Sequence, residues 1–481
     1  MLLWIHLPHI VMQMNSVKWS LPLFFSALFS TFFSCNQGPS DDNYEAFFGG
    51  EVLNPKTRYI ILSKGDKVID SIKLDANNRF FAQFDSLAPG LYTFTHEPEY
   101  QYVYFDKNDS LLVLINSKDF DESIVFTGRG EQKNNFLMEM FLRNERDRDS
   151  MFNLFDYEIT KFLPTAEKTY RTNVAYYQNK KEEIQWSDEF DQYARAAVDF
   201  PYYSKKEMYP VIHKIRTGRD IMSNLPASYY EFRKGVDFNN EKLAYFSPYV
   251  KYISHMLNNV AAMKHRHDSG DENTIALKAN TSKMQIADTL LKNNCIKNRI
   301  LNSIAYNYLM EDQNMANNQQ FFEAYYKYST DRNQENEVRK IANAIQNLRV
   351  GGRLPEVQLI TAENEQISSN ELNTPTVIFF WTSQANTHLI EAHKKIHEYK
   401  KKYPRYTFVG VNLDDDQDKW KSFLERLSTD GIVEVRCADF EQIRTRWAIT
   451  KIHRTIVVNP DGTIRNGFTN IFDKDFEKSL H

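Results

Sequence analysis

The sequence predicts a multidomain chain with an N-terminal antiparallel β-sandwich, an all-α middle domain and a C-terminal mixed α/β domain. Its 481 residues are enough for about three domains at roughly 150 residues each. Short alternating apolar runs fill residues 47–130, and a helical apolar period fills residues 131–349. Strands then alternate with helices over residues 350–481. The pattern changes near residues 130 and 350, which we take as the domain boundaries.

The composition excludes several classes of protein. Lys and Arg number 59 and Asp and Glu number 63, so a net charge of −4 gives no basic field, and we expect no nucleic-acid partner. Hydrophobic residues make up 42% of the chain and charged residues 25%, which excludes wholesale disorder. Three cysteines without a Cys-x-x-Cys pair exclude a disulfide scaffold, a zinc ribbon and a dithiol redox motif.

Residues 1–34 have the layout of a secretory signal peptide. Lys18 precedes the uncharged, apolar run 19–33, and the small Ser34 stands before Cys35. As a helix this run rises only about 22 Å, which is too short for a bilayer core of about 30 Å. The signal is more compact if translation starts at Met14, so we expect that the true start codon lies there.

The end of this segment resembles a bacterial lipobox, in which the cysteine is diacylated and becomes the mature N-terminus, although Phe32 stands where Leu is usual. The resemblance implies lipidation at Cys35 and a polar tether over residues 35–46. It also implies a membrane contact through the lipid anchor, in an outer-membrane lipoprotein of the cell envelope that faces the periplasm or the cell surface. The alternative is that Cys35 merely lies near an ordinary cleavage site.

Residues 47–130 predict the β-sandwich because short apolar runs recur between turn signals such as Pro89-Gly90 and Asn108-Asp109. We see no catalytic constellation in this region. The expected strands are 59–62, 68–72, 80–84, 91–94 and 111–115.

Residues 131–349 predict helices because apolar residues recur every three or four positions in segments rich in Lys, Glu, Gln and Asn. Ile286 and Leu290 show this spacing, as do Val338 and Ile341 further along the chain. The pattern indicates a helical middle domain.

Residues 350–481 predict a mixed α/β sheet. The continuous apolar run 376–381 is typical of a strand that is buried on both faces. A helix is expected after it, with one apolar face formed by Leu389, Ala392, Ile396, Tyr399 and Tyr403. The later segments predict strands at 406–411, 432–435, 455–458 and 463–468 and helices at 418–427 and 443–447.

Five sequence blocks in this region resemble TlpA-like thioredoxin-fold proteins, the membrane-tethered disulfide reductases of bacterial envelopes. The blocks are 354–359, 376–383, 411–415, 447–449 and 457–462. Looser similarity upstream, for example at Pro89-Gly90-Leu91-Tyr92, extends the resemblance to multidomain lipoproteins that carry such a domain. The resemblance implies that residues 350–481 form a thioredoxin-like domain.

The chain departs from this family at the residues that carry its chemistry. Redox-active members have two cysteines at the start of the helix, where this chain has Ala385 and His388, and a cis-proline where it has His453. Disulfide exchange needs an attacking thiolate and a second thiol. We therefore expect no catalytic residue at these positions, no cofactor and a redox-inactive domain. Polar residues near the start of the helix are expected to act as caps: Ser383, Asn386 and Thr387.

The resemblance also implies a groove that can hold an extended chain. The candidate ligand groove is lined by Trp381, Gln384, Asn386, His388, His453 and Arg454. Our leading interpretation is that the degenerate domain binds envelope proteins or extended peptide segments. The alternative is a TlpA-like thiol-disulfide oxidoreductase that uses a non-standard cysteine, Cys437, or the thiol of a partner.

A third interpretation is a metal-handling module. If the alignment holds, His388 and His453 lie against each other in space, and His393 and His397 are one turn apart on the same helix. Neighbouring lysines and the lack of a carboxylate ligand argue against a metal, and we expect none. The acidic run 414–418 is expected to place negative charge at the entry of the following helix.

Overall fold

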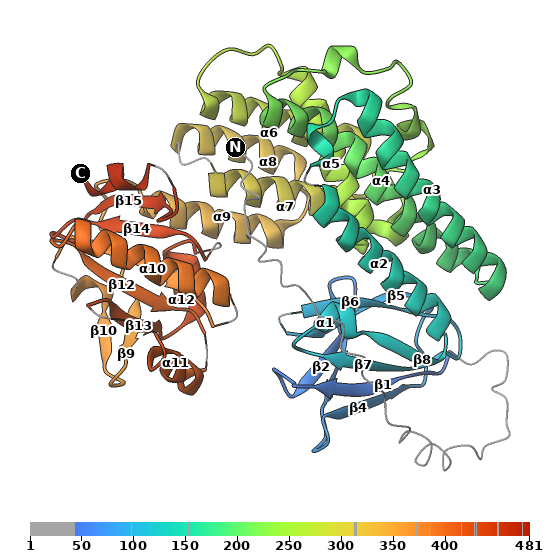
Figure 1. Cartoon of the computed structure of the whole chain (residues 1–481), viewed down its shortest axis with the longest axis horizontal. Helices are drawn as coiled ribbons and strands as arrows, with labels where there is room; N and C mark the ends of the chain where they lie inside the picture. Colours follow the sequence, from blue (N-terminus) through green and yellow to red (C-terminus); the bar gives the residue numbers. More distant parts are fainter. Residues whose placement is uncertain are drawn as a thin grey trace, which may run out of the picture.

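The computed structural model describes residues 44–481 except 98, 152, 312–314, 372–373, 384, 415, 428, 430, 450–451 and 474 (Figure 1). The predicted signal peptide, the lipidation site Cys35 and most of the tether lie outside the described residues. Within the described residues, no helix is both long enough and apolar enough to cross a membrane. The chain has a β-rich N-terminal region, a helical middle region and a C-terminal α/β domain.

Eight strands form the β-rich region in two four-stranded sheets, β4-β1-β7-β8 and β3-β2-β5-β6. Neighbouring strands run antiparallel except β1 and β7, which are parallel, with Phe47 opposite Ser110 and Leu53 opposite Asn116. The expected antiparallel arrangement is therefore wrong at this pair, because alternation predicts a strand but not its neighbour in the sheet. The strands are β1 (Ala46–Leu53), β2 (Tyr59–Lys64), β3 (Lys67–Lys73), β4 (Arg79–Phe84), β5 (Gly90–His96), β6 (Glu99–Phe105), β7 (Ser110–Asn116) and β8 (Val125–Arg129), with the short α1 (Phe120–Ser123) before β8.

One apolar core lies between the two sheets. The rings of Phe48 in β1 and Phe94 in β5 are both fully buried, and their centres are 5.8 Å apart. The second sheet also packs on the helical region through its other face. There the ring of Tyr104 in β6 lies 5.0 Å from the ring of Phe190. The second sheet thus joins the β-rich region to the helices.

The helical region contains helices α2 to α9. Their bounds are α2 (Glu131–Met151), α3 (Ile159–Ile184), α4 (Asp188–Thr217), α5 (Ser247–Lys264), α6 (Glu272–Leu290), α7 (Asn294–Glu311), α8 (Met315–Tyr328) and α9 (Arg332–Asn347). A buried ion pair joins its elements: Nε of Arg233 donates to Oε1 of Glu207 in α4 at 2.8 Å. Nδ2 of Asn259 in α5 donates to Oε2 of the same carboxylate at 2.7 Å. The carboxylate is fully buried, and these two donors offset the free energy lost when its charge is removed from water.

The C-terminal domain is built on a seven-stranded mixed sheet with the order β10-β9-β13-β12-β11-β14-β15. Its elements are β9 (Gln358–Thr361), β10 (Gln366–Ser368), β11 (Thr376–Trp381), α10 (Asn386–Lys402), β12 (Thr407–Asn412), α11 (Gln417–Leu424), β13 (Val433–Cys437), α12 (Phe440–Arg446), β14 (Thr455–Val458) and β15 (Ile464–Thr469). Every residue of β11 is buried, so the structure confirms a central strand at 376–381. The β9–β10 hairpin was not predicted, because both strands are short.

Different helices pack on the two faces of this sheet. The first face carries Phe379 and Trp381, which share an apolar cluster with the buried face of α10. On the opposite face, Ile378 and Phe380 belong to one cluster with Ile345 of α9 in the helical region. Figure 1 shows the C-terminal domain beside α9, with α10 across its sheet. The C-terminal domain is therefore packed against the helical region rather than separated from it by a linker.

Candidate functional site

The expected degenerate site lies where β11 ends and α10 begins. Ala385 occupies the N-cap position of α10 and makes no side-chain cap hydrogen bond. The buried Oγ of Ser383 has no hydrogen-bond partner among the described residues, so the prediction that Ser383 caps this helix is wrong. Gln384 lies outside the described residues, and so do the side chains of Asn386 and Thr387.

His388 takes the place of the family's second cysteine and is half-buried in the first turn of α10. Its Nε2 donates to the carbonyl oxygen of Phe380 at 3.0 Å. Burial lowers the pKa of His388, so the ring is neutral at pH 7. The histidine therefore ties the first turn of α10 to β11.

His453 is half-buried in that loop, next to Ile452. It lies close enough to Asp473 to lower the pKa of that carboxyl, although burial has the larger effect and raises it. Across the described part of the chain, no three His, Cys, Asp or Glu side chains are grouped so as to hold a metal ion. Since Nε2 of His388 donates to a carbonyl oxygen, that nitrogen has no lone pair for a metal.

Arg454 follows His453 but does not line a groove. It is 6% exposed, and its Nε and Nη2 donate to the carbonyl oxygen of Gly467 at 3.0 and 2.9 Å. A further nitrogen donates to the carbonyl oxygen of Ala448, and the guanidinium lies 3.9 Å from the ring centre of Phe468. The prediction that Arg454 faces a ligand is therefore wrong, because its donors are used to hold β15 and the turn after α12.

Trp381 is also fully buried, so it cannot line an open groove as predicted. Its Nε1 donates to Oε2 of Glu434 at 2.9 Å. Oε1 of the same carboxyl lies 3.1 Å from Nε2 of His393 in α10. Glu434 belongs to β13 and reaches across β12 at Gly410, where a Cβ atom would lie only 2.6 Å from Oε1. Glycine in β12 is thus what lets this polar cluster form under α10.

The hydrogen bonds of His393 indicate where the protons of this cluster lie. Nδ1 lies 2.7 Å from the carbonyl oxygen of Leu389 and must donate to it. In a neutral ring Nε2 then carries no proton and can only accept. Its hydrogen bond with Glu434 therefore requires a proton on the carboxyl group. Burial raises the pKa of Glu434, in spite of the donors from His393 and Trp381, which favours the carboxylic acid at that contact. A neutral pair avoids the cost of two charges in the core.

The loop between β11 and α10 is held by Asp414, which follows β12. Oγ1 of Thr382 donates to one carboxylate oxygen of Asp414. The backbone N–H of Ser383 donates to the other oxygen at 2.7 Å, and Nδ2 of Asn412 donates to it at 2.9 Å. Two residues later, Asp416 caps α11, which places negative charge at the entry of that helix as predicted. The acidic run therefore positions two loops.

The described cysteines lie away from the start of α10. Cys437 is the last residue of β13, is 2% exposed and pairs with Leu359 of β9. Its apolar cluster is the one on the sheet face opposite α10. Cys295 is half-buried in α7, where its Sγ donates to Oη of Tyr245 at 3.4 Å. Neither thiol is placed to replace the missing pair at Ala385 and His388.

A cleft of about 940 Å³ lies between the β-rich and helical regions and includes Tyr245 and Cys295 in its lining. Its charged groups pair with one another. Arg299 and Tyr245 both donate to Asp66, at 2.8 and 2.7 Å, and Lys242 in turn pairs with Glu189 at 2.9 Å. The contacts of Asp66 join the β-rich region to the helical region, whereas Lys242 and Glu189 both belong to the helical region, and all of these groups have a structural role.

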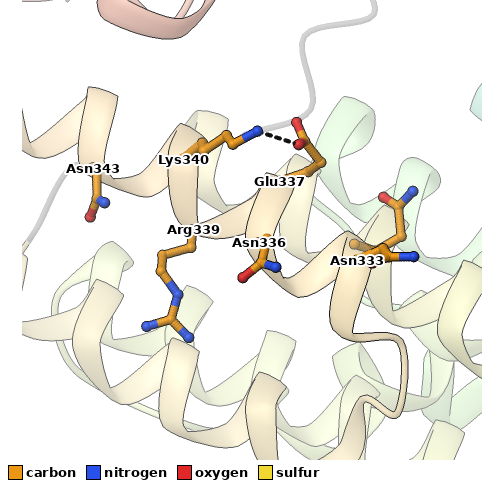
Figure 2. Close-up of a pocket in the computed structure, with 7 residues that line it drawn as sticks. Asn333, Asn336, Glu337, Arg339, Lys340 and Asn343 are labelled. Carbon is orange, nitrogen blue, oxygen red and sulfur yellow. Dashed lines mark hydrogen bonds and ion pairs between the residues drawn. The ribbon is translucent and has the colours of Figure 1, made fainter.

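A second, shallower depression of about 570 Å³ lies along α9. Figure 2 shows Lys340 paired with Glu337, while Arg339 points to the other side of the helix. Asn336 and Asn343 complete a polar face, opposite to the buried residues of α9. One helix supplies the whole lining, so we interpret this depression as the hydrated face of an amphipathic helix.

The sequence interpretation missed the residues that organise this end of the domain: Glu434, His393 and Asp414. One signal was present, since Glu434 interrupts the apolar run 432–435 of a predicted strand. A buried acid in such a run needs a partner. The partner could not be found from the sequence, because it depends on the register of β13 and β12 at Gly410.

Comparisons with known proteins agree with this architecture. A thioredoxin-like family model matches residues 373–464, so the chain carries a thioredoxin-like domain. The search of curated proteins gave no match. The chain is similar to the crystal structure of a thioredoxin-like protein from Bacteroides caccae, at 16% identity over 55% of this chain and 96% of that one, with a TM-score of 0.34.

Two further solved structures are thiol-disulfide oxidoreductases. One is from Bacteroides fragilis, at 21% identity over 27% of this chain and 99% of that one, with a TM-score of 0.23. The other is a thioredoxin domain from Bacteroides vulgatus, at 18% identity over 28% of this chain and 99% of that one, with a TM-score of 0.22.

Proposed function

We propose that this chain is a lipid-anchored protein of the cell envelope whose thioredoxin-like domain binds other proteins or envelope ligands without exchanging disulfides. The observation that carries the proposal is the state of His388. It stands in place of a cysteine, and its half-buried ring is hydrogen-bonded to the backbone carbonyl of Phe380 at 3.0 Å. A side chain engaged in this way holds the loop in place and offers no nucleophile.

The chemistry of exchange supports a binding role. A thiolate must attack one sulfur of a disulfide, and a second thiol must then resolve the mixed disulfide. A helix N-terminus assists by stabilising the thiolate, yet here Ala385 occupies the N-cap of α10. Cys437 is buried on the other side of the sheet. The surface that remains at this site includes His388, His453 and the ring of Phe472, which is 42% exposed.

The experiment is a disulfide-reduction assay on the chain from Asn36 onward, which contains every described residue. We expect no catalysed reduction of insulin or of a DTNB-coupled substrate above the level of free cysteine. A matched control introduces two cysteines with Ala385→Cys and His388→Cys, which restores the family's spacing and shows that the assay detects a thiol pair at this position.

The oxidoreductase alternative predicts a different result. It requires measurable turnover by the unmodified chain and its loss in Cys437→Ser. That result would replace the binding proposal. Unchanged turnover in Cys437→Ser would point to Cys295 or a partner thiol and would also overturn it.

A separate measurement tests binding at this surface. A photo-crosslinking amino acid at position 472 should capture a partner in envelope extracts, because Phe472 lies 5.8 Å from the ring of His388. The matched control places the same amino acid at Ile215, which is 61% exposed in α4. Equal capture at both positions would contradict a binding role for the site. Lipidation is tested by palmitate labelling of the full chain, which should disappear in Cys35→Ala.

A further inference from the structure

The β-rich region presents one uncovered apolar sheet face. It belongs to the sheet β4-β1-β7-β8 and points away from the core between the two sheets. The apolar side chains on it are strongly exposed: Phe81 62%, Val125 50%, Leu114 43%, Leu53 41% and Leu112 40%. We call this set the outer apolar face. Clusters of exposed apolar side chains on a soluble protein mark contacts with membranes or proteins.

The register of the strands joins all of these residues except Leu53 in one patch, and the ion pair of Arg79 with Glu51 lies on the same face between Leu53 and the rest. Gly49 in β1 lies between Phe81 of β4 and Leu112 of β7. A Cβ atom on Gly49 would be 3.0 and 3.2 Å from these two side chains, so they close over the glycine from both sides. Phe47, also in β1, stacks on Phe81 with ring centres 5.9 Å apart. On the other side, Leu114 of β7 lies opposite Val125 of β8.

The other sheet shows what a covered face looks like in this molecule. Tyr102 and Tyr104 in β6 point at the helical region, where Tyr102 lies 5.2 Å from the ring of Phe246 and its Oη donates to the carbonyl oxygen of Tyr245 at 3.2 Å. No described residue packs in this way over the outer apolar face. Figure 1 places β1 and β4 at the end of the molecule far from α6 and α8.

The start of the chain lies beside this face. Tyr44 is the first described residue, and Phe47, three residues later, already belongs to the patch. Eight residues lie between Tyr44 and Cys35, and even fully extended this stretch spans no more than about 32 Å. An anchor at Cys35 would therefore hold this sheet, rather than the helices or the thioredoxin-like domain, at the membrane surface.

We propose that the outer apolar face rests on the lipid bilayer and orients the protein on it. This inference rests on the lipid anchor of the proposed function and adds to it a second, non-covalent contact. An aromatic and aliphatic surface gains free energy by entering the boundary between headgroups and acyl chains, as interfacial segments do. The helical region and the α10 end of the thioredoxin-like domain are then held away from the membrane.

The test is vesicle binding by the chain from Asn36 onward, which has no lipid. Vesicles of phosphatidylethanolamine and phosphatidylglycerol in a 3:1 ratio, roughly a bacterial composition, are floated on a density gradient with the protein. We expect binding by the unmodified fragment, and a loss of about tenfold in bound protein for Phe81→Ser combined with Leu112→Ser, since both side chains leave the patch.

The control is Ile215→Ser in α4, where the side chain is 61% exposed, about as much as Phe81. It should bind vesicles like the unmodified fragment, and circular dichroism should show that all variants are folded. The proposal is overturned if the unmodified fragment does not float, or if Ile215→Ser loses as much binding as the double variant. It is also overturned if the double variant dissociates a dimer by light scattering without changing flotation, since the face is then a contact between two copies.

Failure of this proposal differs from failure of the lipid anchor. The vesicle assay uses a fragment without Cys35, so its result does not depend on lipidation. Palmitate labelling of the full chain reports on Cys35 alone. A labelled chain whose fragment does not float keeps the anchor and loses the bilayer contact, and an unlabelled chain loses the anchor.

Discussion

The surface at the start of α10 and the interior directly beneath it differ in the polar side chains that they contain. At the surface stand Ala385, with no polar group, and His388, whose hydrogen bond goes to the backbone. Beneath them lie Glu434, His393 and Trp381, which bond to one another in the core. The ionisable groups at this end of the domain, Glu434, His393 and His388, thus make hydrogen bonds that stabilise the fold.

This difference separates the requirements of a reactive site from those of a structural cluster. A reactive site needs an exposed group whose protonation changes during the reaction. A structural cluster needs buried groups whose hydrogen bonds are complete. The predictions below test whether the interior is structural and whether the surface contributes little to stability. Each uses the fragment from Asn36 onward, in which three of the four tryptophans, Trp381, Trp420 and Trp447, report on this domain by fluorescence.

The largest effect is expected for Glu434→Ala. Its loss leaves Nε1 of Trp381 and Nε2 of His393 buried without their partner, and it opens a cavity above Gly410. We expect the free energy of unfolding to fall by about 3–5 kcal/mol, because two buried polar groups lose their partner and a cavity remains. Guanidinium unfolding followed by tryptophan fluorescence measures this change. A loss below about 1 kcal/mol would show that the cluster does not hold the domain.

A second large effect is expected for Arg454→Ala. The substitution removes three donors from the carbonyl oxygens of Ala448 and Gly467 and the contact with Phe468. We expect a loss of about 3 kcal/mol, because buried acceptors lose charged donors and a cavity remains. The same unfolding assay applies. If this variant instead loses partner capture at position 472 with unchanged stability, Arg454 belongs to the binding surface after all.

The pH dependence of stability gives a smaller and more specific effect through Glu434→Gln. The amide can accept from Trp381 and donate to Nε2 of His393, so the variant should lose less than about 1 kcal/mol at pH 5. In the folded unmodified protein the pKa of Glu434 is raised above about 4.3, its value in an unfolded chain. Between these two values the folded state binds more protons.

The carboxyl therefore contributes stability that is present below about pH 4.3 and is lost as pH rises through the raised pKa. Other groups also titrate in this range, so the measured quantity is the difference between the two proteins. We expect the unmodified fragment to lose stability relative to Glu434→Gln as the pH rises through the raised pKa of Glu434. Parallel pH profiles would show that Glu434 is not protonated in the fold.

The smallest effect is expected at the surface. His388→Ala removes the hydrogen bond to the backbone carbonyl of Phe380, which should cost about 1 kcal/mol. Glu391→Ala, on the next turn of α10, is the matched control, since its ion pair with Lys394 is exposed and 4.0 Å long. A cost for His388→Ala as large as that for Glu434→Ala would erase the distinction between surface and interior.

Local patterns predicted the elements of this chain well wherever one face or both faces are buried. The run 376–381 reads as a buried strand because every side chain in it is apolar, and α10 reads as a helix because its apolar residues repeat at helical spacing. The sequence also shows directly that positions 385 and 388 are not cysteines, because residue identity does not depend on the fold. Each of these conclusions depends on residues that are close together in the sequence.

What the sequence alone determined was therefore the order of regions and the main elements. Tertiary structure alone decided that β1 and β7 run parallel, that Trp381 and Arg454 are buried, and that Glu434 meets His393 across Gly410. These facts depend on strand order and register between segments far apart in the chain. A one-residue shift in register turns a side chain from the core to the solvent, and local pattern does not encode which neighbour it will meet.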